Sequence, residues 1–151
     1  MARIEFELGS PLSPETVLSN LVDFGEHRPE LWPAIDARVY RVHAVGDGWA
    51  EVTEGTDFLG GIWARERYDW SEPGMVQATI QDSNFWYPGG IWRLRAEPGP
   101  DGGSRLTVIR DRRAKGLKAR LFEGLVKFAG ARILASELRK APALGLAREP
   151  S

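Results

Sequence analysis

The sequence contains no cysteine and only two histidines, His27 and His43. Without cysteine the chain has no disulfide, thiolate nucleophile, iron–sulfur cluster or cysteine-bound zinc. Two histidines cannot supply a three-histidine zinc site, and these two lie too far apart for a helical pair at i and i+4. We therefore predict that the protein binds no metal and needs no cofactor.

Motifs for nucleotide binding and for serine catalysis are also missing. The sequence has no glycine-rich motif that cradles phosphates and no GxSxG turn. The opening residues, MARIEFELG, carry charges and no long apolar run. They predict neither a secretory signal nor a membrane span. We expect a cytoplasmic protein without stable membrane insertion.

Charge is balanced overall but uneven along the chain. The 151 residues carry a net charge of −1, yet acidic residues prevail over 1–60 and basic residues over 110–151. The basic stretch 110–120 contains no aromatic residue, so it lacks base-stacking groups, and we expect no nucleic-acid partner. This stretch is either a solvated strand end and helix start, or a surface for an anionic membrane or an acidic partner.

The first part of the chain has one strand pattern followed by helix signals. Residues 3–8 alternate between polar and apolar, which is typical of a half-buried strand. Ser13 is a good N-cap and Pro14 suits the first helical position, so a helix is predicted to begin here and end near Gly25. A short helix is predicted over 28–32.

From residue 37 the period changes to two. Glycine, proline and aspartate turns separate six predicted strands, at 37–45, 49–56, 62–70, 75–82, 90–97 and 104–112. Connections this short permit only antiparallel pairing. Helical spacing then predicts one long helix over 115–140, and residues 142–151 are expected to form a disordered tail.

These elements predict an α+β fold in one domain over 1–141. A curved antiparallel seven-stranded sheet (β-α-α-β6-α) would bury one face against the long C-terminal helix. The apolar arc of that helix is wider than packing on a flat layer requires, which favours a sheet that curves around it. Small residues at its centre, such as Gly124 and Ala135, allow either close packing or space for a ligand.

Alternation along the strands assigns a side to each residue, although the strands at 37–45 and 49–56 are ambiguous. The expected inward-facing side chains are Ile62, Ala64, Glu66, Tyr68, Trp70, Val76, Ala78, Ile80, Trp92, Leu94, Ala96, Leu106, Val108 and Arg110.

Glu66 and Arg110 interrupt this apolar face. A buried charge is costly unless it is paired or meets a polar ligand. One interpretation is structural: the two residues pair with each other, or reach water at the strand ends. The other is functional: they point into a cavity and orient a polar group of a ligand.

The densest aromatic stretch is 83–92, which includes Phe85 and Trp86 beside a predicted turn. These rings either form a satellite cluster that covers the core, or a mobile lid at the mouth of a pocket. In the second interpretation Trp32 would form the opposite wall of the mouth.

The chain resembles the START-like, or SRPBCC, superfamily and is most similar to its polyketide cyclase/dehydrase and lipid-transport proteins. The stretches that carry the resemblance are Ser13-Pro14-Glu15 after the opening strand, HRPELWPAI over 27–35, YDWSEPG over 68–74 with DSN over 82–84, and RDRR over 110–113. The resemblance implies the helix-grip fold, with a hydrophobic cavity between the curved sheet and the long helix.

The resemblance also suggests where a ligand would lie. Polar residues inside the cavity perform the chemistry of reactive members, and Glu66, Tyr68 and Arg110 are the candidates here. The side chains expected to line the cavity are Trp32, Ala64, Trp70, Ala78, Phe85, Trp86, Trp92, Leu94, Val108, Leu121, Gly124, Leu125 and Phe128.

We predict binding or transport of a small hydrophobic ligand of lipid, polyketide or aromatic type. The alternative is a polyketide cyclase or dehydratase, in which Glu66 or Tyr68 moves a proton and Arg110 stabilises an enolate. A second alternative is an interaction module with a filled core.

Overall fold

The computed structural model describes residues 2–57, 60–116, 121 and 131–146. Its elements in chain order are β1 (Ala2–Ser10), α1 (Pro14–Leu21), α2 (Arg28–Leu31), β2 (Arg41–Gly46), β3 (Trp49–Thr56), β4 (Ile62–Asp69), β5 (Met75–Ser83), β6 (Ile91–Pro98), η2 (Pro100–Gly102), β7 (Ser104–Arg112) and η3 (Pro142–Leu144). Residues 131–139 are helical and precede η3. The helix predicted over 115–140 does not begin at 115, because Lys115 and Gly116 are not helical and Gly116 has a φ of 83°. Residues 117–120 and 122–130 of this prediction lie outside the described ranges.

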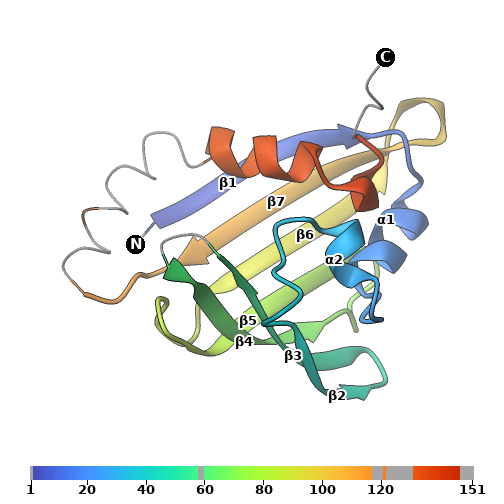
Figure 1. Ribbon diagram of the computed structural model, residues 1–151. Coiled ribbons are helices and arrows are strands. Elements are labelled where there is room, and N and C mark those ends of the chain that lie inside the picture. The colour runs from blue at the N-terminus through green and yellow to red at the C-terminus, as the bar shows by residue number, and fades with distance from the viewer. Residues whose placement is uncertain (1, 58–59, 117–120, 122–130, 147–151) are drawn as a thin grey trace.

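The seven strands form one antiparallel sheet in the order β1-β7-β6-β5-β4-β3-β2. Figure 1 shows this sheet as a curved layer, with α1, α2 and the helix at 131–139 on one side. We call the covered side of the sheet the inner face and the opposite side the outer face. The predicted α+β architecture and the antiparallel sheet are confirmed.

The start of α1 is confirmed, but its predicted end is wrong. The Ser13 hydroxyl accepts a hydrogen bond from the backbone nitrogen of Thr16 at 3.2 Å, as an N-cap should. The helix ends at Leu21 and not near Gly25, because the guanidinium of Arg28 takes the Leu21 carbonyl at 2.8 Å. A side chain thus replaces the next helical turn as the partner of this carbonyl.

The strand predicted over 37–45 begins only at Arg41. Residues 37–39 form a turn around Asp36, whose carbonyl accepts hydrogen bonds from the backbone nitrogens of Val39 and Tyr40. The Asp36 carboxylate also accepts from the backbone nitrogen of Arg38 at 2.9 Å. An aspartate that satisfies neighbouring backbone groups in this way competes with strand pairing.

Alternation places the expected side chains on the inner face. The buried residues there include Ala64, Glu66, Tyr68, Val76, Ala78, Ile80, Leu94, Ala96, Leu106 and Val108, and β3 adds Ala50 and Val52. The inner face of the strand at 49–56, which the sequence left ambiguous, is therefore the one that carries Ala50 and Val52.

The main core lies at one end of this inner face. Val17 and Leu21 of α1 pack there with Leu138 of the C-terminal helix and with Leu144 of η3. Within the described ranges, no helical segment combines the length and the hydropathy needed to span a bilayer.

The described part of the tail, residues 142–146, is ordered, contrary to the expectation for 142–151. Ala143 and Leu144 are fully buried. The Leu144 carbonyl accepts a hydrogen bond from the Ser10 hydroxyl at 2.6 Å, and the Ala143 carbonyl accepts one from the Asn20 amide at 2.9 Å. Gly145 adopts a left-handed conformation (φ 68°) against Leu12. Residues 142–146 are held because they supply apolar side chains to the core. Short-range sequence patterns do not reveal such long-range contacts.

We expect Leu144→Ala to lower the free energy of unfolding by about 2–5 kcal/mol, because it leaves a cavity at a fully buried position. Urea unfolding followed by circular dichroism measures the change. Ile133→Ala is the control: this side chain is 56% exposed, so its truncation should change stability by less than about 0.5 kcal/mol. Equal stability of the Leu144→Ala variant and the wild type would show that the tail is not part of the core.

Candidate functional site

Five charged side chains meet within the fold on the inner side of the sheet. We call this set, Arg28, Glu54, Glu66, Arg110 and Arg112, the interior polar cluster. It contains two ion pairs, Arg28–Glu54 and Arg112–Glu66, each with its closest nitrogen and oxygen 3.2 Å apart. Arg110 and Arg112 lie toward the end of the sheet where β7 finishes, whereas Arg28 contacts Leu21 and Tyr68 of the main core.

Strand register explains how Glu66 and Arg112 meet. Glu66 on β4 lies opposite Ile80 on β5, and the backbone nitrogen of Ile80 donates to the Gly90 carbonyl. Arg112 on β7 packs beside Gly90, where a Cβ atom would lie only 3.2 Å from the Arg112 side chain. Because glycine has no side chain, position 90 leaves room for Arg112 to reach across the inner face to Glu66.

The expected pairing of Glu66 with Arg110 is therefore wrong. Arg112 lies two residues further along the same face of β7 and reaches Glu66. Arg110 instead lies opposite Trp92 on β6 and Ile4 on β1, in the neighbouring row of cross-strand residues. The Nε atom of Arg112 is buried and has no hydrogen-bond partner among the described residues.

Arg110 is partly buried and stacks on Trp86, with its guanidinium carbon 4.9 Å from the ring centre. Among the described residues it forms no hydrogen bond and no ion pair. Burial, together with the positive charge of Arg112, lowers the pKa of Arg110 to about 9, while Glu66 acts in the opposite direction. Arg110 therefore remains charged at neutral pH without a carboxylate partner of its own.

Burial also shifts the acidic groups of the site. It raises the pKa of the Glu66 carboxyl, an effect that Arg112 partly offsets and Glu54 reinforces. Burial raises the pKa of the Tyr68 hydroxyl well above its usual value, and Glu54 and Glu66 raise it further. Tyr68 is thus a neutral hydroxyl at physiological pH and a poor source of a proton, whereas Glu66 becomes a stronger base.

Arg28 connects the helical segment to the sheet. Only 1% of it is exposed. It donates to the carbonyls of Leu21 and Asp23 and to the Glu54 carboxylate, and its guanidinium lies over the rings of Phe24 and Tyr68. These contacts fix the position of α2 against β3 and β4.

Three members of the cluster were not predicted from the sequence. Arg112 shares the strand phase of Arg110, so period-two reasoning carried two residues further would have placed it on the inner face. Glu54 belongs to a strand whose faces were both mixed. Arg28 lies in a four-residue helix, which is too short to show any periodicity.

The stretch 83–92 forms a satellite cluster. Trp86 is 8% exposed and packs with Ala64, Ile80 and Ala114, and Phe85 meets it edge-on at 4.6 Å between ring centres. The Ser83 hydroxyl accepts hydrogen bonds from the backbone nitrogens of both aromatic residues at 3.0 Å. These contacts match the covering-cluster interpretation.

Trp32 and Tyr87 do not belong to this satellite cluster. Trp32, considered as an opposite wall, packs in the main core and donates to the Asn20 carbonyl at 3.4 Å. It belongs to a different hydrophobic cluster from Trp86. Tyr87 is exposed at the end of the molecule where Trp86 lies, with Arg113 over its ring.

The remaining candidate residues divide into three groups. Ala64, Ala78, Leu94 and Val108 are buried on the inner face, and Trp70 and Trp92 are partly buried there. Leu121 is 71% exposed, so the structure does not place it against the sheet. Gly124, Leu125 and Phe128 lie outside the described residues.

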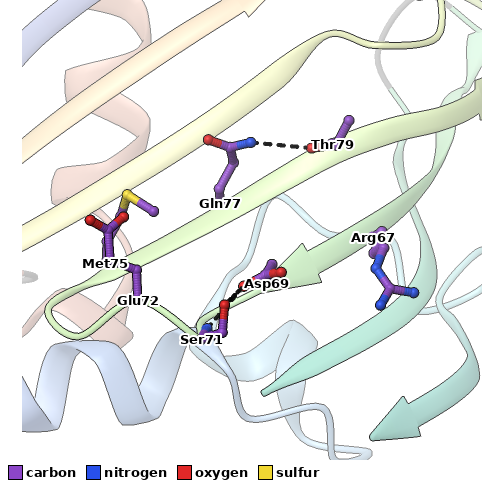
Figure 2. A pocket seen from close by; sticks show the side chains of 7 residues that line it. All are labelled: Arg67, Asp69, Ser71, Glu72, Met75, Gln77 and Thr79. Atoms are coloured by element: carbon purple, nitrogen blue, oxygen red, sulfur yellow. Dashed lines mark hydrogen bonds between the residues drawn. The ribbon is translucent and has the colours of Figure 1, made fainter. Parts of the chain in front are cut away.

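A hollow of about 310 Å³ opens on the outer face of the sheet. Figure 2 shows its lining, with hydrogen bonds between Gln77 and Thr79 and between Ser71 and Asp69. Its lining residues are Arg67, Asp69, Ser71, Glu72, Met75, Gln77 and Thr79. Six of these seven side chains are polar, so the hollow does not suit an apolar ligand.

No group of histidine, aspartate and glutamate residues that could hold a metal ion occurs in the described part of the chain.

Comparison with known proteins places this geometry in a fold family. No protein-family model and no curated protein matches the sequence, but solved structures match in shape. Protein TTHA0849 from Thermus thermophilus aligns with 97% of this chain and 99% of its own, at 15% identity and a TM-score of 0.76. A START superfamily protein from Mycobacterium smegmatis aligns with 94% of this chain and 98% of its own, at 14% identity and a TM-score of 0.72. The chain has the START-like helix-grip fold.

An aromatase/cyclase shares the START-like fold with this chain. The Zhui aromatase/cyclase from Streptomyces sp. R1128 covers 93% of this chain and 93% of its own length, at 15% identity and a TM-score of 0.70. The resemblance expected from the sequence is confirmed at the level of the fold.

The raised pKa of Glu66 predicts a specific pH dependence of stability. A group whose pKa is raised in the folded state stabilises the fold most at low pH. For Glu66 this contribution is fully present below its ordinary pKa of 4.5, and it is lost as pH rises through the pKa of the folded protein. The free energy of unfolding of the wild type, minus that of Glu66→Gln, should therefore fall from about pH 4 to about pH 8. Urea unfolding of both proteins across this range provides the measurement.

Glu51→Gln is the matched control with the opposite sign. Hydrogen bonds from Gln81 and from two arginines lower the pKa of Glu51 on the outer face, so the corresponding difference should rise over the same pH range. A difference for Glu66 that rises with pH would contradict the assigned environment.

Proposed function

We propose that the protein binds a small hydrophobic ligand of lipid, polyketide or aromatic type on the inner face of its sheet, beneath the C-terminal helix. The observation that carries this proposal is Arg110. Its guanidinium lies within an apolar face, is partly buried, and has no ion-pair partner among the described residues. A ligand that combines an apolar body with one polar group would give Arg110 the partner that the described residues do not supply.

The inner face has an apolar region and a polar region, and together they suit such a ligand. Apolar side chains, including Leu94 and Val108, fill the rows toward α1, whereas the interior polar cluster lies toward the end of β7. Trp92 is partly exposed between the two regions. Burial of apolar ligand surface would supply affinity, and the polar end would orient the molecule.

The fold supports this proposal without identifying the ligand. The START superfamily protein and the aromatase/cyclase are similar in shape to this chain. Because their sequence identity to it is low, the substrates of these proteins are not carried over.

Trp92→Leu tests whether the inner face is the binding surface. We expect it to weaken binding of the neutral fluorescent probe 1-aminoanthracene about tenfold, because the probe loses contact with the larger ring. The change in probe fluorescence on titration gives the dissociation constant.

Trp63→Leu is the matched control, since Trp63 lies on the outer face of β4 and its substitution should leave binding unchanged. Native mass spectrometry of protein purified from its own host complements the titration, since a co-purifying apolar compound is expected. A wild type that neither binds the probe nor carries such a compound would favour an interaction module with a filled core.

A cyclase or dehydratase is a second candidate, which the environment of Glu66 favours. A buried carboxylate with a raised pKa can remove a proton from the carbon between two carbonyl groups. Arg110 would stabilise the resulting enolate, whose carbon attacks a third, more distant carbonyl group of the same polyketone. The proton then passes from Glu66 to the new alkoxide, and loss of water completes an aldol condensation. Tyr68, with its strongly raised pKa, would act as a hydrogen-bond donor.

Glu66→Gln tests the second candidate. We expect it to slow cyclisation of a linear polyketone by about 10²–10⁴-fold, since glutamine cannot accept the proton. Product formation is followed by liquid chromatography with mass detection, and Glu51→Gln on the outer face is the control that should retain the rate. Equal rates for the wild type, Glu66→Gln and Arg110→Met would remove both residues from any catalytic role.

A further inference from the structure

We propose that the ligand of this protein is an anion, an apolar molecule with a carboxylate group that binds to the edge of the Arg110 guanidinium. This inference rests on the proposed ligand-binding function and adds the charge class of the ligand. It follows from the balance of charges in the interior polar cluster and from the way Arg110 is held.

The interior polar cluster has an excess of positive charge. It contains three guanidinium groups and two carboxylates, and each carboxylate already has a partner: Glu54 pairs with Arg28 and Glu66 pairs with Arg112. The unpaired charge belongs to Arg110. Lys115 brings a further positive charge to the same end of the inner face, where its amine donates to the Ser83 carbonyl at 2.7 Å.

The contact with Trp86 occupies one face of the Arg110 guanidinium and leaves its edge available. A guanidinium carries five N–H donors in its plane, whereas a cation–π contact uses its flat face. None of the Arg110 donors is used by a described residue. The in-plane donors of an arginine match the two oxygens of a carboxylate, which favours a planar, singly charged group.

The platform beneath Arg110 is itself fixed. The backbone nitrogen of Trp86 is held by the Ser83 hydroxyl, and Trp86 also forms a β-bridge with Ala114. The same ring lies 5.9 Å from the guanidinium carbon of Arg112. Both guanidinium groups therefore lie near the same ring, and the pairing of Arg112 with Glu66 leaves Arg110 without a counter-charge of its own.

Electrostatics favour an anion over a neutral or cationic ligand. The loss of water and the proximity of Arg112 both disfavour the charged form of Arg110, and the opposite charge of a bound carboxylate would offset both effects. An amine would meet the positive excess of the cluster and be repelled. A neutral apolar ligand would bury Arg110 without giving it a counter-charge, which is costly.

Two matched pairs of compounds test this inference: 9-anthracenecarboxylate with 9-anthracenemethanol, and decanoate with 1-decanol. Isothermal titration calorimetry at neutral pH gives the affinity of each compound for the wild type. We expect each carboxylate to bind about tenfold or more tightly than its alcohol, which is the usual range for a charge-assisted hydrogen bond that is not fully exposed. Arg110→Met should bind the alcohols as well as the wild type does and lose the preference for carboxylates.

Controls separate the loss of a specific partner from a general change in charge. Arg105→Met makes the same substitution on the same strand, but this side chain lies on the outer face and pairs with Glu97 at 2.7 Å, so the preference should be retained. Arg110→Lys retains a charge and should retain part of the preference. Circular dichroism confirms that each variant is folded.

The outcomes distinguish the two levels of the proposal. Equal binding of acids and alcohols by the wild type would overturn the anion inference and leave apolar ligand binding intact. Tighter binding of the acids that persists in Arg110→Met would also overturn it, by showing that another group meets the carboxylate. Absence of binding by all four compounds would remove the ligand-binding function itself, and the inference with it.

Discussion

Pairing between β1 and β7 is the interaction on which the arrangement of this protein depends. Nine residue pairs join the first strand of the sheet to the last, so the two ends of the chain meet in one layer. Because α1 and α2 follow β1, and the C-terminal helix and η3 follow β7, this pairing brings them to the same face of the sheet (Figure 1). The bonds from Ser10 to Leu144 and from Asn20 to Ala143 are consequences of that arrangement.

The inner face of this sheet has two regions. Toward the end of β1, helix α1 and η3 cover an apolar core. Toward the end of β7, arginine side chains project over the sheet, and the paired carboxylates of β3 and β4 compensate two of them. Ion pairs of this kind are weak contributors to stability relative to apolar packing of the same volume. Here they fix neighbouring elements, since Arg28 ties α2 to β3 and Arg112 ties β7 to β4 across Gly90.

Sequence patterns predicted what depends on near neighbours. Period-two alternation gave the inner face, the turn residues gave the antiparallel sheet, and Ser13 with Pro14 gave the start of α1. The errors arose where a distant residue decides the outcome: Arg28 ends α1, Asp36 delays β2, and the burial of Leu144 orders the tail. The partner of Glu66 was also mistaken, because strand phase shows which face a side chain occupies but not which row it reaches. The use of Glu66, Tyr68 and Arg110 by a ligand remains a prediction.

The two proposed uses of the site compete for one guanidinium. A cyclase would require Arg110 to stabilise an enolate near Glu66, whereas an anionic ligand would occupy the same N–H donors with its carboxylate. Glu66 is already held by Arg112, and transfer of a proton from the ligand to Glu66 would neutralise that carboxylate and so disrupt its ion pair with Arg112. The positive excess of the interior polar cluster amounts to the one guanidinium that lacks a carboxylate. It therefore matches a bound monoanion while the Arg112–Glu66 pair stays intact. Proton abstraction by Glu66 would instead disrupt that pair, and this favours binding over chemistry for a carboxylate ligand.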